Sequence, residues 1–148
     1  MKIDWSPLRH AIKHAENPRF WWRDDDAVAQ TNALDQMLRL SETLRTPVQI
    51  AVIPGLLEPS LAPALDGTTA RVLVHGWTHT NHAPAGEKKA EFRRADTAAI
   101  DELSQGMNIL ATNFGGRLDP VFVPPWNRVS PALYTPLADA GYRAISTY

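Results

Sequence analysis

Short apolar runs alternate with stretches of helical periodicity along this chain. Five of these runs predict β-strands: Phe20–Trp22, Val48–Ile53, Arg71–Val74, Val121–Val123 and Ala144–Ser146. Apolar spacing, caps and terminating residues predict helices from Ser6-Pro7 to near Asn17-Pro18, and over Thr31–Leu44, Ala95–Phe114 and Pro131–Ala140. With a helix expected at each crossover, strands and helices alternate, which predicts an α/β fold with a parallel sheet.

The most unusual polar residues directly follow predicted strands. Asp24–Asp26 follow the first strand, His75–His82 the third, and Pro124–Arg128 the fourth. In parallel sheets, functional groups collect at the carboxyl ends of the strands, which share one edge. We therefore expect these three segments to converge on one rim of the domain.

The composition is typical of a globular domain and argues against several kinds of partner and site. The 148 residues are 44% hydrophobic and 21% charged, an ordinary globular balance, and we expect one domain spanning 1–148. A net charge of -1 and a pI near 6.5 argue against nucleic acid or an anionic membrane as the partner. The absence of cysteine excludes disulfides and thiolate metal sites. The N-terminus has no signal-like apolar core and Val48–Ile53 is too short to cross a bilayer, so we expect a cytoplasmic protein.

Three adjacent carboxylates and a cluster of histidines are the candidate metal ligands. Asp24–Asp26 repel one another unless a cation offsets their charge, although a solvated acidic turn has the same sequence. His75 and His79 lie on one face if their segment turns helically, a spacing that suits two ligands of one metal. His82 is a spare histidine, and the His10/His14 pair is interpreted as surface.

The third segment is a loop stiffened by Pro124 and Pro125. It holds Trp126 in a fixed place, where the indole forms either a wall for a sugar ring or part of the core. The charged segment 85–92, which follows the histidines, is interpreted as a solvated helix start rather than a lid.

In this order, the segments Asp25-Asp26, His75–His79 and Val123–Trp126 resemble the motifs of the polysaccharide deacetylases. These are the family 4 carbohydrate esterases, with a chitooligosaccharide-deacetylase homology domain. The resemblance extends over residues 20–148. It implies a distorted seven-stranded (β/α) barrel that is incomplete here, because this chain carries about five strands and lacks the C-terminal ones.

Carried over residue by residue, the resemblance implies that Asp25 is the general base and that Asp26, His75 and His79 bind the metal. The other register of the acidic run would use Asp24 and Asp25. The implied reaction is hydrolysis of a C–N amide bond, which deacetylates an N-acetylated carbohydrate or a related small amide. The ligand set suits Zn²⁺, and also accommodates Co²⁺, Fe²⁺, Ni²⁺ or Mn²⁺. The expected substrate contacts are Asp24, His82, Pro125, Trp126 and Arg128.

Several departures from the family pattern keep other interpretations open. Val123 stands where the family has an arginine, Gly76 where it has Ser or Thr, and the segment carrying the general-acid histidine is absent. His82 is the only spare histidine near the expected site. The chain could therefore be a non-catalytic relative that binds a metal and a carbohydrate-like ligand, or a plain βα domain with accidental motifs. An open sheet edge would also favour pairing of two copies.

Overall fold

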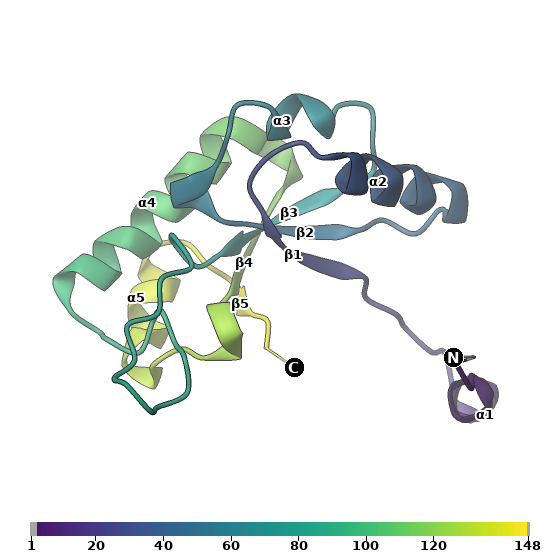
Figure 1. The fold of residues 1–148 in the computed structure, drawn as a ribbon, viewed down its shortest axis with the longest axis horizontal. Coiled ribbons are helices and arrows are strands. Elements are labelled where there is room, and N and C mark those ends of the chain that lie inside the picture. Colours follow the sequence, from purple (N-terminus) through teal and green to yellow (C-terminus); the bar gives the residue numbers. More distant parts are fainter. Residues whose placement is uncertain (1–2, 148) are drawn as a thin grey trace.

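A five-stranded parallel sheet forms the centre of the molecule (Figure 1). The computed structural model describes residues 3–147. Met1, Lys2 and Tyr148, which belong to the expected 1–148 domain, lie outside the described residues. The strands are adjacent in chain order: β1 (Arg23–Ala27), β2 (Gln49–Val52), β3 (Arg71–His75), β4 (Leu118–Val123) and β5 (Ala144–Ile145). The predicted α/β class and the parallel sheet are confirmed, and β3 is the central strand.

Helices lie around the strands, as crossovers of a parallel sheet require. They are α2 (Asn32–Leu44), α3 (Leu61–Ala64), α4 (Thr97–Phe114) and α5 (Tyr134–Asp139). The side chain of Thr31 accepts a hydrogen bond from the amide of Leu34, which confirms the predicted cap of α2. The predicted Pro131–Ala140 helix is divided, because a 3-10 turn over Pro131–Leu133 precedes α5.

Both faces of the central strands are buried. On one face, the β2 and β3 side chains belong to the same cluster as Leu103 and Leu110 of α4. On the other face, Ala51, Leu73 and Val123 form a smaller buried cluster. This explains why these strands appear in the sequence as continuous apolar runs rather than as alternating patterns.

The first strand lies three residues later than predicted. Phe20 and Trp21 are exposed and outside the sheet, whereas Arg23 and Asp24 pair with β2. The physical reason is that β1 is an edge strand, where acidic side chains reach water, so an apolar run is not needed to form it. Asp24–Asp26 are therefore part of the strand, not the turn that follows it.

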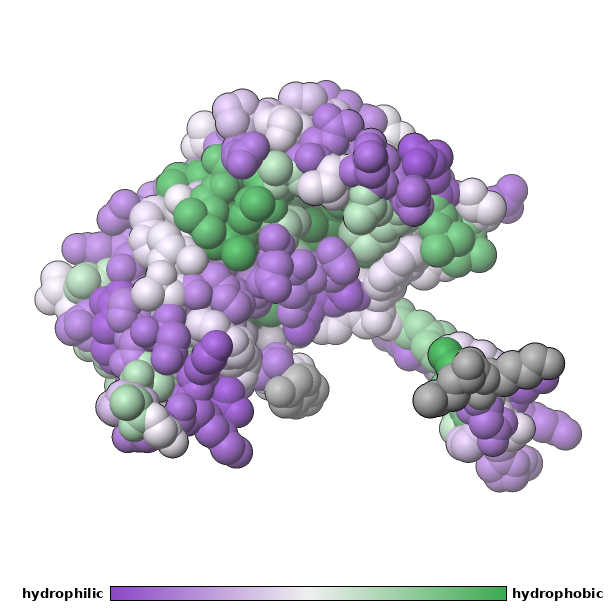
Figure 2. Space-filling model, in the orientation of Figure 1, coloured by the Kyte–Doolittle hydropathy of each residue, from purple (hydrophilic) through white to green (hydrophobic). Residues whose placement is uncertain are grey.

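The N-terminal helix α1 (Ser6–His14) buries none of its residues and projects away from the body (Figure 2). It ends at His14, before the predicted stop at Asn17-Pro18. His10 and His14 are exposed, as expected, with their ring centroids 4.4 Å apart. In residues 3–147, no helix is long and apolar enough to cross a membrane.

The two edges of the sheet approach each other. Nη1 of Arg23 on β1 donates a hydrogen bond of 2.6 Å to the hydroxyl of Ser146, which follows β5. In a flat sheet, four strand spacings would separate these edges by about 19 Å. The sheet is therefore strongly curved, with β1 and β5 facing one another across its open side.

Candidate metal centre

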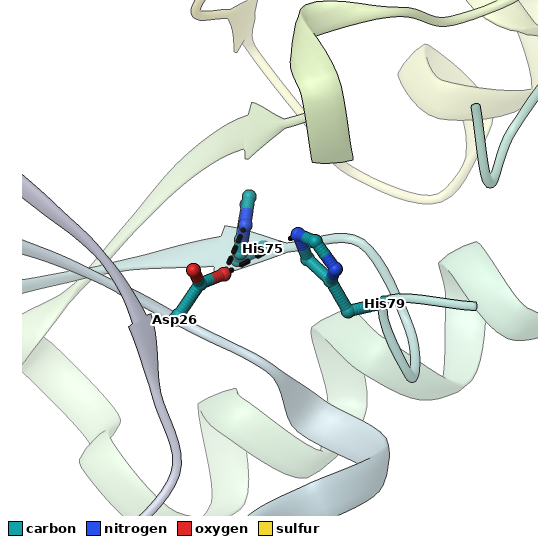
Figure 3. A group of neighbouring side chains, drawn as sticks. All are labelled: Asp26, His75 and His79. Carbon is teal, nitrogen blue, oxygen red and sulfur yellow. Dashed lines mark hydrogen bonds and ion pairs between the residues drawn. The ribbon is translucent and has the colours of Figure 1, made fainter. Parts of the chain in front are cut away.

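One carboxylate and two imidazoles meet at the carboxyl end of the sheet (Figure 3). Oδ1 of Asp26 lies 3.0 Å from Nε2 of His75 and 3.3 Å from Nε2 of His79. One ligand atom from each of the three residues lies within 4.8 Å of the other two. The structure brings together the three side chains that the sequence analysis named as ligands. Asp26 is the residue of the acidic run that lies with the two histidines.

The hydrogen bonds of His75 determine what can lie between its ring and Asp26. Nδ1 of His75, which is only 2% exposed, lies 2.9 Å from the carbonyl oxygen of Val123. A carbonyl can only accept, so Nδ1 carries the proton. Nε2 of a neutral ring then directs a lone pair at the Asp26 carboxylate, which is also an acceptor. Two acceptor atoms 3.0 Å apart need a proton or a metal ion between them, so the geometry fits a shared metal ion without requiring one.

Asp26 reaches the histidines because the backbone of β1 is irregular at this point. Its φ of 69° lies in the left-handed region, and the register against β2 shifts between Asp24 and Ala27. Its side chain is 64% exposed, in contrast with the buried His75. The cluster therefore has one wall in the core and one side open to water and to a ligand.

The segment that joins the two histidines is not helical, contrary to the expectation from their spacing. Residues 76–80 form a bend in which both Gly76 and His79 have a φ of 58°. This chain reversal, rather than one turn of helix, places the rings with their centroids 5.1 Å apart. The physical reason is that β3 ends against β4, where the amide of Gly76 bonds to the carbonyl of Val123.

Asp24 and Asp25 lie beside the cluster. Together with Asp26 they line a hollow of about 220 Å³ between β1 and α2. Loss of water contact raises the pKa of Asp24, and the neighbouring charges of Asp25 and Asp26 raise it further. The three carboxylates thus lie together, and the roles of substrate contact for Asp24, base for Asp25 and metal ligand for Asp26 stay predictions.

Arg23 holds Asp25 in a two-pronged ion pair. Its Nε and Nη2 donate to the two carboxylate oxygens of Asp25 at 2.8 and 3.0 Å, and its Nη1 bonds to Ser146. The planar guanidinium fixes both the position and the orientation of the carboxylate. Arg23 therefore provides a guanidinium partner for Asp25 although Val123 occupies the motif position of an arginine. Arg128 bonds to the carbonyls of Lys89 and Trp126 and is not a partner of Asp25.

The proline-rich loop lies directly against the histidines. The ring of Trp126 is 4.3 Å from that of His79, and Trp126 is only partly buried. Pro125 is buried, and a side chain at Gly76 would collide with it. Trp126 is thus available to a ligand on one side, whereas the buried Pro125 braces the loop, and its predicted substrate contact stays a prediction.

His82 and Arg128 do not join the cluster. His82 is exposed, and its amide bonds to the carbonyl of Ala90. Nη1 of Arg128 donates to the carbonyls of Lys89 and Trp126. Arg128 also lines a larger, open hollow of about 660 Å³, together with Gly86–Lys88, Ala90, Arg93 and Val129–Pro131. None of the three clustered residues lines this hollow. The predicted substrate contacts of both residues remain predictions.

Two residues of the site region were missed by sequence reasoning. Ser146 supports Arg23 from the opposite edge of the sheet, and Glu91 is buried beneath the histidine bend. Glu91 lies in a run of charged residues that was interpreted as a solvated helix start, which is wrong because α4 begins at Thr97. Nothing in the sequence pattern distinguishes this glutamate from its exposed neighbours.

Comparison by sequence and comparison by structure give different results. The sequence matches no family model and no curated protein. By structure, the chain is similar to a family 4 carbohydrate esterase from Streptomyces lividans in complex with acetate. The TM-score is 0.67 and the identity 19%, over 89% of this chain and 64% of the other.

Two further solved structures are similar to this chain in fold. The Streptococcus pyogenes deacetylase PplD, in complex with acetate, has a TM-score of 0.59 and 12% identity, over 95% of this chain and 62% of that one. A family 4 acetyl xylan esterase from Clostridium thermocellum, in complex with a cobalt ion, has a TM-score of 0.52 and 15% identity, over 84% of this chain and 71% of that one.

The chain therefore has the α/β fold seen in family 4 carbohydrate esterases and deacetylases. It spans less than two thirds of the length of the Streptomyces and Streptococcus proteins. At these identities the likeness establishes the fold, and the chemistry has to be argued from the residues of this chain.

Proposed function

We propose that this protein is a metal-dependent hydrolase that cleaves C–N amide bonds and deacetylates an N-acetylated carbohydrate or a related small amide. The observation that carries the proposal is the convergence of both histidine Nε2 atoms on one oxygen of Asp26. The deacetylases and esterases among the structural neighbours support the same reaction class.

The donor set fits a divalent metal ion. Two imidazole nitrogens and one carboxylate oxygen suit Zn²⁺, and also Co²⁺, Fe²⁺, Ni²⁺ or Mn²⁺. His75, His79 and Asp26 would hold the ion, leaving coordination positions open on the exposed side of Asp26. Such an ion supplies Lewis acidity, which activates water and polarises an amide carbonyl.

Asp25 is the proposed base, which would accept a proton from the attacking water. Its carboxylate cannot rotate freely because both oxygens are held by Arg23. Arg23 is thus the positioning residue for the proposed base, anchored in turn by Ser146.

The substrate would bind over the partly exposed Trp126, next to His79. An indole face suits the flat, apolar side of a sugar ring. The other proposed contacts with the substrate are Asp24, His82, Pro125 and Arg128. The link between Arg23 and Ser146 supports the proposal that 1–148 is a single domain whose curved sheet belongs to an incomplete, distorted barrel.

A second candidate is a non-catalytic protein that binds a metal and a carbohydrate-like ligand. It is favoured by the lack of a general-acid candidate: in residues 3–147, the nearest spare histidine in sequence, His82, is exposed and outside the cluster. Such a protein would bind ion and ligand without turnover.

Metal analysis of the purified protein, run together with hydrolysis assays on acetylated sugars and small amides, tests both candidates. We expect about one divalent ion per chain, lost in His75→Ala and His79→Ala. The matched control is the double variant His10→Ala/His14→Ala, which removes an exposed pair of equal spacing and keeps the ion. Metal-dependent release of acetate supports the hydrolase, and ligand binding without turnover supports the second candidate. A wild-type protein free of metal and activity would exclude both.

A further inference from the structure

Glu91 is a fully buried carboxylate for which the proposed chemistry has no use. It is 1% exposed and lies between the buried Ala90 and Phe92, in the irregular segment between β3 and α4. Burying a carboxylate is costly unless its lone pairs are all satisfied. Its partners therefore indicate what it is there to hold.

The hydrogen-bond partners of Glu91 all lie in residues 77–80, the segment that contains His79 and follows His75. Oε2 accepts from the amide of Trp77 at 3.0 Å. Oε1 accepts from the amides of Thr78 and Thr80 at 2.8 and 3.1 Å, and from the Thr78 hydroxyl at 3.3 Å. These backbone amides, freed when β3 ends, converge on one anion and enclose His79 between them.

Gly76 allows this approach. Any side chain at Gly76 would overlap the Glu91 carboxylate and the ring of Pro125, and its φ of 58° is itself unfavourable for other residues. The residue that departs from the Ser or Thr expected after the first histidine thus makes room for a buried acceptor. The bend and the glutamate fit each other as a unit.

The segment around Glu91 is fixed on both sides. Ala90 accepts from the amide of His82 at 2.9 Å, and Phe92 accepts from the amide of Ser130 at 2.8 Å. Phe92 also forms a parallel bridge with Val129 and is fully buried. Residues 90–92 therefore connect the histidine loop to the loop that carries Trp126, with Glu91 at the centre.

We propose that Glu91 is a positioning residue that sets the place of His79 in the metal centre. His75 needs no such help, because its ring is held by the core and by Val123. His79 has a strained backbone, and its position depends on the amides on either side of it. This inference rests on the proposed metal centre, which it extends to a residue outside the ligand set.

The test compares Glu91→Gln with Tyr142→Phe. Both changes nearly preserve shape and alter a buried hydrogen bond, but the Tyr142 hydroxyl bonds to the Leu103 carbonyl, away from the metal centre. We expect Glu91→Gln to weaken Co²⁺ and Zn²⁺ binding at least tenfold, as changes behind a ligand do, and to alter the visible spectrum of the Co²⁺ form. Tyr142→Phe should lower thermal stability and leave both readouts at the wild-type value.

Measurements on the metal-free proteins separate this inference from the proposed function. Amide exchange at Trp77, Thr78 and Thr80, and the imidazole resonances of His79, should change in Glu91→Gln and not in Tyr142→Phe. Co²⁺ binding within twofold of wild type, or unchanged exchange at these amides, would overturn the role of Glu91 while leaving the metal centre intact. If the wild-type protein binds no metal, while Glu91→Gln still changes these amides and the His79 resonances, the proposed function is overturned instead.

If Glu91→Gln does not fold, Thr78→Val takes its place, because it removes one hydrogen-bond donor to Glu91. The measurements and the results that would overturn the role of Glu91 are the same.

Discussion

The central strand β3 and the edge strand β1 supply the same cluster with side chains held in opposite ways. His75 is buried at the end of β3, where it pairs with Val123 of β4, and its ring is fixed by a backbone carbonyl. Asp26 is mostly exposed, in a left-handed conformation at a shift in register. The centre of the sheet thus provides a ligand whose place is fixed by folding.

The edge strand provides a ligand that water can reach. This division suits a site that must bind an ion and also admit a substrate, because an entirely buried cluster would exclude the substrate. It also separates stability from metal binding: replacing His75 should affect both, whereas replacing Asp26 should affect metal binding alone.

Replacing His75 tests the central side and should have the largest effect. His75→Ala removes a ligand, a buried ring and a hydrogen bond, so we expect loss of the ion together with about 2 kcal/mol of unfolding free energy. Metal analysis and urea denaturation of the metal-free protein measure the two effects. Unchanged stability would contradict the division between centre and edge.

Replacing Asp26 tests the edge side. Asp26→Asn keeps the shape but removes the charge, so we expect metal affinity to fall at least about 100-fold, more than for a supporting residue. Because Asp26 is exposed, the metal-free variant should unfold at the wild-type urea concentration. Isothermal titration with Zn²⁺ and urea denaturation measure these outcomes. A marked loss of stability would show that the edge is as structural as the centre.

Replacing Arg23 separates two functions within β1. Arg23→Gln frees the Asp25 carboxylate, so we expect kcat/KM to fall about 10- to 100-fold through misplacement of the base. Bound metal should be unchanged, because Arg23 contacts none of the three proposed ligands. Steady-state kinetics and metal content are the readouts, and a parallel loss of metal would refute the assignment.

The helix cap beside the edge strand provides a control for stability. Thr31→Ala removes the acceptor for the Leu34 amide at the start of α2, which should cost about 1 kcal/mol of unfolding free energy. Metal affinity should stay within twofold of wild type, since α2 carries no ligand. A large change in affinity would indicate that α2 positions the acidic run.

The cap of α4 adds a dependence on pH and should have the smallest effect. The Ala99 amide bonds to the Asp96 carboxylate and holds its pKa below the ordinary value of 3.8, with Arg94 adding to the effect. A lowered pKa contributes stability that is complete above 3.8 and is lost as pH falls through the folded-state value. Asp96→Asn keeps an acceptor that does not titrate. Its difference from wild type in urea midpoint should therefore shrink in acid, and a constant difference would count against this linkage.

The sequence predicted regular parts of the fold better than irregular ones. The runs at β2 and β3 are buried on both faces, as are Phe122 and Val123 at the end of β4, so their apolar character identified them. β1 carries Asp24–Asp26 inside the strand, where no apolar pattern exists to find it. The meeting of Asp26 with His75 and His79 followed from strand order, since carboxyl ends of parallel strands share an edge.

The supporting contacts could not be predicted in the same way. Glu91 acts through a bend whose shape depends on Gly76 and on the end of β3. Ser146 reaches Arg23 only because the whole sheet curves. Both contacts depend on tertiary geometry and leave no local periodicity in the sequence.

The hydrogen bond between Arg23 and Ser146 also bears on how the site is assembled. It joins residues that are 123 positions apart, so it closes only after almost all of the described chain has been synthesised. Forming so long a loop is slow compared with local pairing of β2 and β3. On the ribosome, the histidine side of the centre would therefore form early, and Asp25 would be locked in place last, when β5 docks.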